Sequence, residues 1–434
     1  MIRLYDFDEV KPEEILNRDI RAEADVEATV DAIIADVRAR GDAALLDYAA
    51  KFDHAQLTSV QVTQAEIDEA FSELEASDPE FITTLKMAAS NIRHFHEQQL
   101  HKNFVLNDRP GMVLGQKYTP IQRAGVYVPG GTAAYPSTVL MDVIPAKVAG
   151  VQQIVMTTPA GKDGKVNAGI LAAAVIAGID CIFKTGGAQA VAALAYGTES
   201  VPAVDKIVGP GNIYVATAKR KVFGKVGIDM IAGPSEILVL ADGTCSPAWV
   251  AADLLSQAEH DKLATPVLVT DSWDLAKAVQ AELEVQIPQL PRAAIARASV
   301  DTNGKIIVTD DMKKAIDAVN IIAPEHLEIC VDDPFAVLND IQNAGSIFLG
   351  KNVPEALGDY FAGPNHTLPT SGTARFSSPL GVDDFCKRSS FLYYSPQALA
   401  DAAPRIAEFA RREGLEAHAR SVCARAKQAK EVQL

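Results

Sequence analysis

The sequence predicts an α/β protein whose parallel sheets are divided between two domains. From about Arg123 onward, short β-type runs alternate with helical patterns, which is the signature of βαβ units. There are too many of these runs for one small sheet. The length of 434 residues independently favours roughly two to three domains.

The expected strands are short apolar runs that follow one another through the centre of the chain. They are residues 125–129, 153–158, 181–185, 205–209, 236–241, 265–270 and 305–309. The first hundred residues are mostly helical, with apolar residues at three- and four-residue spacing and Gly41 as a break. After about Gly381 the pattern ends in a helical tail rich in Ala, Arg and Glu.

The composition is that of an ordinary globular protein, with 48% hydrophobic and 22% charged residues. A net charge of −16 argues against nucleic acid and anionic membranes as partners, because both select for basic surfaces. The five cysteines form no CxxC pair, and the first residues do not resemble a signal peptide. The most apolar stretch, residues 167–179, is too short to span a bilayer. We therefore expect a cytoplasmic protein with reduced thiols.

Three glycine turns follow expected strands, at Pro129–Gly131, Gly186–Gln189 and Gly209–Asn212. Such turns let backbone N–H groups approach a phosphate closely. None completes the GxGxxG pattern, since Tyr214 stands where the third glycine would be. Each turn alone is more often an ordinary left-handed turn. Three of them in one βα region favour a nucleotide site.

Residues 228–261 form the most informative stretch of the chain. The turn AGPSE leads into the apolar run ILVL, and the helical stretch that follows ends with Gln257, Glu259 and His260. Gln257 and His260 are three residues apart, so their side chains share one helix face. A single helical histidine is more often a plain surface or core residue, and glutamine is an unusual zinc ligand. The layout still places ligand-type side chains beside a tight turn, where α/β enzymes build their sites.

Glu325 and His326 lie in the apolar segment IIAPEHLEIC. A carboxylate and an imidazole in apolar surroundings suit general acid–base chemistry, because burial shifts their pKa values. The alternative is a plain helix N-terminus, in which Glu325 follows Pro324 and is favoured by the helix dipole. The residues alone leave both interpretations open.

Other polar residues are ambiguous when they are taken one at a time. Asp359 and His366 lie in a long polar loop, and long ordered loops often carry function. Glu413 and His418 by themselves are solvated residues of a tail helix. The cluster HFHEQQLH at 94–101 lacks the second histidine of an HExxH zinc motif, and we interpret it as structural.

Several long, ungapped segments carry a resemblance to a known family. They are AGVYVPGGTAAYPSTVLM, GGAQAVAALAYGTESVPAVDKIVGPGN, IDMIAGPSEILVLAD, DLLSQAEHD, APEHLEI, GDYFAGPNHTLPTSGTARFSSPLGV and REGLEAHA. They occur in the same order as in the L-histidinol dehydrogenase family, which the chain resembles over essentially its whole length. That family oxidises L-histidinol to L-histidine in two steps, at the end of histidine biosynthesis. The resemblance therefore implies two NAD molecules per reaction, one bound zinc per subunit and histidinol as the substrate.

The resemblance also implies site residues. The zinc ligands from one subunit match Gln257, His260 and Asp359. The fourth zinc ligand, from the partner subunit of a homodimer, matches His418. The substrate contacts are these ligands together with Ser235, His326 and Glu413. The NAD-binding positions match Tyr127, Gln189 and Asn212.

The fold implied by the resemblance is a pair of incomplete Rossmann-like domains with helical N- and C-terminal arms that wrap a homodimer. We expect an N-terminal arm at 1–25 and a dimerisation tail at 381–434. The first domain, with the zinc and catalytic residues, is expected at 26–126 with 236–380. The second domain, which contacts NAD, is expected at 127–235.

Two neighbouring residues are the expected catalytic pair. Zinc would orient the substrate through its nitrogen donors. His326 is the candidate base for the hydroxyl proton, and Glu325 is the candidate that activates water to hydrate the aldehyde. A thiohemiacetal on a cysteine is the rival mechanism. No cysteine lies in a matched motif core, and the nearest, Cys330, is expected to be a buried structural thiol.

Two other classes of protein remain as alternatives. A zinc hydrolase would use Glu325 to activate water, but it would leave the glycine turns unexplained. A two-domain solute-binding protein would carry an export signal, which the sequence does not show. Reduction of a nicotinamide nucleotide distinguishes all three.

Overall fold

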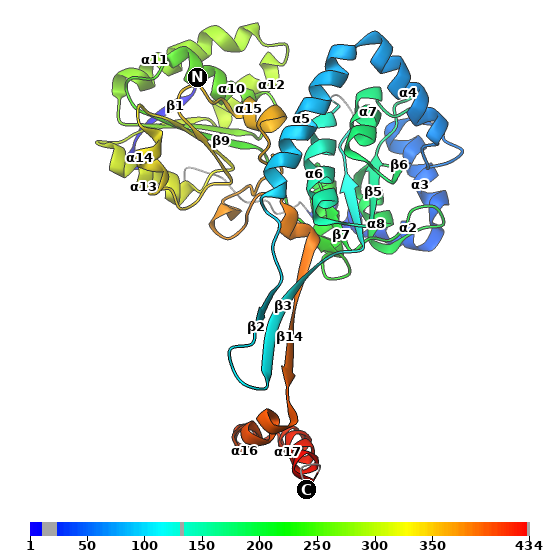
Figure 1. Ribbon diagram of the computed structural model, residues 1–434. Coiled ribbons are helices and arrows are strands. Elements are labelled where there is room, and N and C mark those ends of the chain that lie inside the picture. The colour runs from blue at the N-terminus through cyan, green and yellow to red at the C-terminus, as the bar shows by residue number, and fades with distance from the viewer. Residues whose placement is uncertain (11–23, 131–133, 432–434) are drawn as a thin grey trace. The chain divides into compact units, whose positions relative to one another are not determined.

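The computed structural model of this chain describes residues 1–10, 24–130 and 134–431 and contains two compact units (Figure 1). The larger unit comprises Met1–Gln99 and Ile121–Phe385, and the smaller comprises Leu100–Pro120 and Cys386–Leu434. The larger unit holds two parallel sheets. All seven expected strands form, with ends within about two residues of the expected ones. The predicted α/β class is confirmed.

The first sheet has six parallel strands in the order β1-β11-β10-β9-β12-β13. Its strands are β1 (Arg3–Asp6), β9 (Glu236–Ala241), β10 (Thr265–Thr270), β11 (Lys305–Val308), β12 (His326–Cys330) and β13 (Ser346–Leu349). Its helices are α10 (Pro247–Ala258), α11 (Trp273–Gln286), α12 (Ala293–Thr302), α13 (Met312–Ile322), α14 (Pro334–Leu338) and α15 (Glu355–Leu357). We call this assembly the six-stranded domain.

Helices cover both faces of this sheet (Figure 1). Ile237 and Val239 of β9 pack with α10, α11 and α12, whereas Leu238 and Leu240 pack with α13 on the opposite face. Successive side chains of a strand point to opposite faces, so a strand covered on both sides needs an unbroken apolar run. The run EILVLA, every residue of which is buried, meets that need.

The second sheet has five parallel strands in the order β6-β5-β4-β7-β8. Its strands are β4 (Arg123–Tyr127), β5 (Gln153–Thr158), β6 (Cys181–Lys184), β7 (Lys206–Val208) and β8 (Gly227–Ile228). Its helices are α2 (Ala24–Arg40), α3 (Asp42–Tyr48), α4 (Gln64–Ser77), α5 (Pro79–Glu97), α6 (Pro136–Ala149), α7 (Ala168–Ala177), α8 (Gly187–Tyr196) and α9 (Ile213–Val222). We call this assembly the five-stranded domain.

The packing corrects the expected boundary that put residues 26–126 in the first domain. Val30 and Val37 of α2 are buried in one cluster with Leu194 of α8, and α4 and α5 pack on α7 and α6. Strand β4 begins at Arg123 and pairs with β5 and β7. These segments therefore belong to the five-stranded domain. An amphipathic pattern shows that one helix face is buried, but it does not say against which sheet.

The N-terminal residues also differ from expectation. Strand β1 pairs in parallel with β11 and extends the six-stranded sheet, so Arg3–Asp6 is not part of an arm. Residues 11–23 of the expected arm lie outside the described residues.

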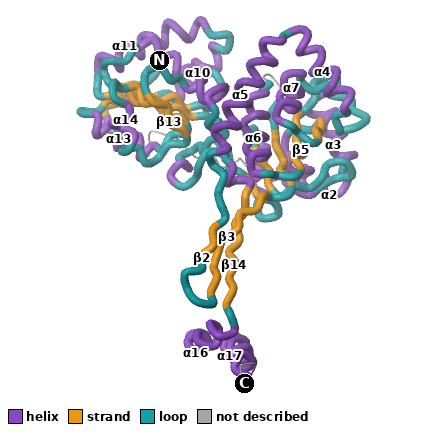
Figure 2. Tube along the Cα trace, in the orientation of Figure 1, coloured by secondary structure: helices purple, strands orange, loops and turns teal. Residues whose placement is uncertain are grey.

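The smaller unit contains a strand where a helical tail was expected. Strand β14 (Cys386–Tyr394) pairs antiparallel with β3 (Met112–Pro120), which also pairs with β2 (Phe104–Leu106). Figure 2 shows this ribbon leading into α16 (Pro396–Arg412) and α17 (Glu416–Glu431). The expectation of a helical tail from about Gly381 therefore holds only from Pro396. The strand was missed because its partner lies some 270 positions earlier in the chain.

The most apolar stretch of the sequence forms α7, a helix of 10 residues that is largely buried. Among the described residues, no helix is both long enough and apolar enough to cross a membrane.

Helix α6 carries a fully buried carboxyl group. Thr367 donates a hydrogen bond from Oγ1 to Asp142 Oδ1 at 2.8 Å, and Asn365 donates to the carbonyl of Met141 at 2.6 Å. Burial, opposed in part by this threonine, raises the pKa of Asp142 to about 8. The segment after β13 is therefore tied to α6 through an acid that is protonated at neutral pH.

Asp142→Asn should change how stability depends on pH. The native state keeps the Asp142 proton up to about pH 8, whereas the unfolded chain loses it near the ordinary value of 3.8. The contribution of this group to the free energy of unfolding therefore falls as the pH rises from about 4 to about 8, by at most about 1.4 kcal/mol per pH unit. The amide has no such proton. The melting temperature of the variant relative to wild type should rise across this range and then level off.

Asp317→Asn, at an exposed position of α13, replaces one carboxyl by an amide in the same way and is the matched control. A difference for Asp142→Asn that follows the same course with pH as that of the control would contradict the assignment.

Candidate active site

Glu325 and His326 lie at the start of β12, beside the start of β9. Ala323 ends α13 with a φ of 50°, Pro324 follows, and the strand begins at His326. The alternative of a helix N-terminus at Glu325 is therefore wrong. His326 is opposite Ile237 in the pairing of β12 with β9.

Both polar groups of the Glu236 backbone hold this pair. The Glu236 N–H donates to Glu325 Oε2 at 2.8 Å, and the Glu236 carbonyl lies 3.0 Å from His326 Nδ1. With a carbonyl as its partner, Nδ1 carries the proton. His326 Nε2 then faces Asp359, whose Oδ1 is 3.5 Å away.

Two carboxylates that follow β13 complete a group of possible metal donors. Asp359 comes from the π-helical turn η4 (Gly358–Ala362), and Glu355 from the short helix α15. One donor atom each from His326, Glu355 and Asp359 lie within 4.8 Å of one another. π-Helical turns are frequent at functional sites, and this mixture of imidazole and carboxylate suits zinc.

The pKa values in this group are strongly shifted. Burial raises the pKa of Glu325 to about 8 and, together with the Asp359 charge, that of Glu355 to about 8. Burial alone would lower the pKa of His326, but Glu325 and Asp359 outweigh it and raise that pKa to about 10. The His326 ring in turn outweighs burial at Asp359 and lowers the pKa of that carboxyl. A cation bound here would lower the pKa of each of these groups, so that the carboxylates would be ionised and the ring neutral around it.

Gln257 and His260, two of the expected zinc ligands, lie at the end of α10. The helix stops at Ala258, and the His260 N–H donates to the Gln257 carbonyl at 3.0 Å, so His260 lies in the closing turn. Desolvation lowers the pKa of His260 against the opposing charge of Asp359, which favours the neutral ring that binds metals. Gln257 is 1% exposed, yet among the described residues neither its Oε1 nor its Nε2 has a hydrogen-bond partner. Buried polar atoms without partners are rare and point to a ligand.

These residues lie at the opposite edge of the sheet from the one at which α/β proteins usually build their sites. The rule for α/β sheets places sites at the carboxyl ends of strands, but these residues gather at the amino ends of β9 and β12. Helix α10 leaves the carboxyl end of β9 and returns to its amino end, which brings Gln257 back. Ser235 lies just before β9, and its backbone carbonyl accepts a hydrogen bond from the Thr265 N–H at 2.9 Å.

Two further histidines have structural partners. His366 Nδ1 lies 3.0 Å from the Asp359 carbonyl, and its Nε2 lies 3.4 Å from Thr138 Oγ1. His366 thus supports the backbone of the turn that carries Asp359. His96 bonds to the Ile92 carbonyl at 2.8 Å within its own helix, as the structural interpretation predicts.

The tail residues belong to the smaller unit. Glu413 follows α16 and His418 lies in α17, and both are exposed within that unit.

The residues expected to bind NAD follow strands of the five-stranded sheet. Tyr127 ends β4, and its hydroxyl oxygen accepts a hydrogen bond from the Gly187 N–H at 3.2 Å. Gln189 is buried in the first turn of α8. Asn212 precedes α9 and caps it, accepting from the Tyr214 N–H at 3.0 Å. The chain order reverses between β4 and β7, so Tyr127 and Asn212 flank the switch point where such sheets bind nucleotides. Gly131, in the first glycine turn, lies outside the described residues.

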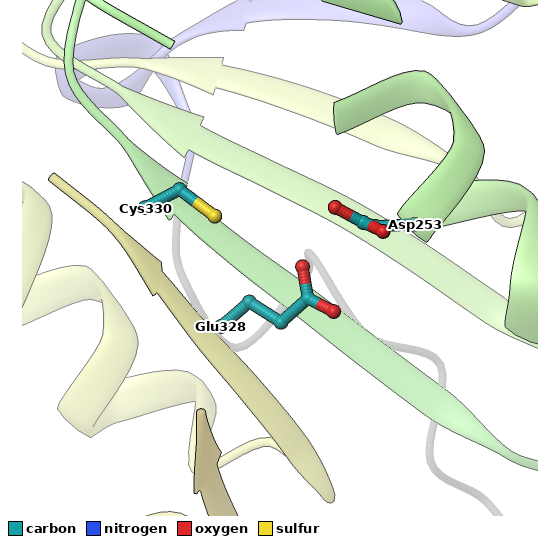
Figure 3. Close-up of side chains that lie close together, drawn as sticks. All are labelled: Asp253, Glu328 and Cys330. Carbon is teal, nitrogen blue, oxygen red and sulfur yellow. The ribbon is translucent and has the colours of Figure 1, made fainter. Parts of the chain in front are cut away.

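A second cluster of possible metal donors, missed from the sequence, consists of Asp253, Glu328 and Cys330 (Figure 3). Donor atoms of Asp253, Glu328 and Cys330 lie within 4.8 Å of one another, and Glu328 Oε1 accepts the Glu355 N–H at 2.7 Å. Burial and the neighbouring Asp253 raise the pKa of Glu328 to about 9, and burial also raises the pKa of Asp253. This pair links α10 to β12.

The sequence holds signals for these residues. Glu328 interrupts an apolar strand two residues after His326, on the same face. Asp253 stands one helical turn before Gln257. No sequence pattern singles out Glu355, which reaches the site only through the fold.

Known proteins match the chain over nearly its whole length. A sequence model of histidinol dehydrogenase matches residues 16–426. The histidinol dehydrogenase of Bacillus subtilis is 57% identical over 397 residues, and that of Lactiplantibacillus plantarum is 56% identical over 397 residues, each match covering 92% of both chains. The crystal structure of histidinol dehydrogenase from Elizabethkingia anophelis aligns with a TM-score of 0.93 at 38% identity and covers 99% of both chains. These matches confirm the resemblance carried by the motifs, and the chain belongs to the histidinol dehydrogenase family.

Proposed function

We propose that this enzyme oxidises L-histidinol through L-histidinal to L-histidine with zinc and two molecules of NAD. Membership of the family supports the substrate and the oxidation. The observation that supports a bound metal is the buried amide of Gln257, one turn before His260, whose two polar atoms have no partner in the part of the chain that the structure describes. An amide of this kind, near an acidic and imidazole-rich group, fits a coordinated cation.

Gln257, His260 and Asp359 are the residues that would hold the zinc. When bound, the metal would supply a Lewis acid that holds the amine and imidazole nitrogens of the substrate and orients its carbinol carbon. Ser235 and Glu413 are proposed as further substrate contacts. His326 is proposed to contact the substrate as well as to take its proton.

His326 is the proposed base for the hydroxyl proton. Its Nδ1–H is fixed on the Glu236 carbonyl, which leaves Nε2 to accept a proton on the side of Asp359. Much of its raised pKa comes from the charges of Glu325 and Asp359. A cation held by Asp359 offsets one of these charges and brings the pKa of His326 closer to neutrality, where a base is most effective.

Glu325 is the proposed group that activates water for the second oxidation. The aldehyde must be hydrated before a second hydride can leave. A carboxyl with a pKa of about 8 exchanges a proton readily near neutral pH. The Glu236 N–H fixes one of its oxygens and thereby orients the other.

NAD is proposed to bind at the carboxyl edge of the five-stranded sheet, against Tyr127, Gln189 and Asn212. The switch point between β4 and β7 and the exposed start of α9 support this location.

A homodimer with shared sites is proposed for the smaller unit. His418 would complete the zinc site of the partner subunit, and Glu413 would contact the substrate there. Several large apolar side chains of this unit are exposed within the single chain, among them Val105, Leu392 and Phe409. Exposed apolar groups of this kind are typical of a protein interface. None of the five cysteines forms a disulfide, which is in keeping with the proposed cytoplasmic location.

Formation of NADH from L-histidinol tests the whole proposal. Protein stripped of metal should be inactive, and added zinc should restore production of two NADH per histidinol. One NADH per histidinol would contradict the second step. No NADH from folded, zinc-loaded protein would overturn the proposed substrate or cofactor.

Glu325→Gln should separate the two half-reactions. The amide still accepts the Glu236 N–H but cannot take a proton from water. Oxidation of supplied L-histidinal should fall by about 10²- to 10⁴-fold, with a smaller loss in oxidation of the alcohol. Glu69→Gln, on the surface of α4, should leave both rates unchanged. Equal losses in both halves would count against this division of labour.

Mixing two inactive variants tests the shared site. His260→Ala and His418→Ala each remove one proposed ligand. In a mixed dimer, one of the two sites still has both histidines, His260 from one subunit and His418 from the other. Random exchange should restore about a quarter of wild-type activity, because half of the dimers are mixed and each has one good site. Native mass spectrometry should verify the exchange. Full exchange without recovery would exclude sites shared between subunits.

A further inference from the structure

A buried ion pair holds the backbone of the turn after β7. Lys219 and Asp229 contact each other directly, and their side chains are 2% and 1% exposed. Lys219 Nζ donates to the Gly209 carbonyl at 3.0 Å, and Asp229 Oδ2 accepts from the Gly209 N–H at 2.8 Å. Both hydrogen-bonding groups of a single residue are thus held by opposite charges.

The backbone at Gly209 is closely confined by its neighbours. Its φ is 113°, and a Cβ at this position would lie 2.1 Å from the Tyr127 carbonyl oxygen. The turn after β7 is therefore pressed against the end of β4, where Tyr127 lies. The buried Asp142 also contacts the space beside Gly209, because its Oδ2 would lie 3.1 Å from that Cβ.

The ion pair also connects the turn to the helix that follows it. Asn212 comes three residues after Gly209 and caps α9 through hydrogen bonds from the N–H groups of Tyr214 and Val215, at 3.0 and 3.3 Å. Lys219 is on α9, about two turns further along. Its bond back to Gly209 therefore fixes the turn, and with it Asn212, relative to the helix.

Stability alone is a weak reason for such a pair. Taking two charges out of water is costly, and an apolar pair of similar volume often stabilises a core as well or better. Apolar side chains, however, cannot bind a backbone N–H and carbonyl. The distinctive property of this pair is that it fixes the course of the turn.

We propose that Lys219 and Asp229 are positioning residues for the dinucleotide: they hold the Gly209–Asn212 turn in the form that binds NAD. The inference rests on the proposed function, because it presumes that NAD binds beside Asn212. Neither residue needs to touch the nucleotide. Removing the pair weakens binding of NAD and leaves the chemistry at the other sheet unchanged once NAD is saturating.

The test compares Lys219→Met with Lys221→Met in the zinc-loaded enzyme. Lys221 is on the same helix but pairs with Asp31 and Glu27 at the surface. The dissociation constant for NAD, measured by titration calorimetry without histidinol, should rise about tenfold or more for Lys219→Met, since small displacements of binding groups have large effects. The KM for NAD should rise in parallel. The KM for histidinol and the kcat at saturating NAD should stay within about twofold of wild type.

A second variant separates positioning from stability, because Lys219→Met leaves Asp229 buried without a partner. The double variant Lys219→Met, Asp229→Leu removes both charges and should fold with a melting temperature near that of wild type. This variant still lacks both side-chain hydrogen bonds to the Gly209 backbone, so it should bind NAD about tenfold or more weakly. Unchanged affinity for NAD in this folded variant would overturn the inference while leaving the proposed function intact. Failure of wild type and Lys221→Met to bind NAD would overturn both.

Discussion

The pairing of β12 with β9 is the contact on which the candidate site depends. It sets Glu325 and His326 beside Glu236, whose N–H and carbonyl hold one of them each. Strand β9 is central in its sheet and buried on both faces, so neither bond can shift without disturbing the core. The two proposed acid–base groups are therefore oriented before any substrate arrives, which is the condition for efficient proton transfer.

The polar groups around this pair are arranged for a positive charge. Glu355 and Asp359 place carboxylates beside His326, and the Gln257 amide is buried without a partner. An unsatisfied buried polar group costs about 1–3 kcal/mol, and coordination of a cation by the amide removes that cost. Asp253, on the helix of Gln257, and Glu328, on the strand of His326, place donor atoms within 4.8 Å of each other. The proposed metal donors and the local packing therefore depend on the same elements.

The two sites proposed for this chain lie at opposite edges of their sheets. In the five-stranded domain, the turns after β4 and β7 lie at the carboxyl edge, where the strand order reverses, and this edge is the one proposed to bind NAD. In the six-stranded domain the acid–base pair precedes β12, and the metal donors come from the end of α10 and the turns after β13. Groups proposed for the dinucleotide and groups proposed for the substrate are thus supplied by different sheets.

The sequence by itself determined the α/β class, the seven strands of the central region, the glycine turns and, through its motifs, the family. These features are local: an apolar run, a turn or a motif can be read without knowing its neighbours. Only the tertiary structure decided which helices, strands and side chains lie against one another. It placed α2–α5 on the five-stranded sheet, paired β14 with β3, grouped Glu355 with His326, and brought Asp253 close to Glu328. The physical reason is that hydrophobic periodicity records which side of an element is buried, whereas strand order and packing depend on contacts between residues hundreds of positions apart.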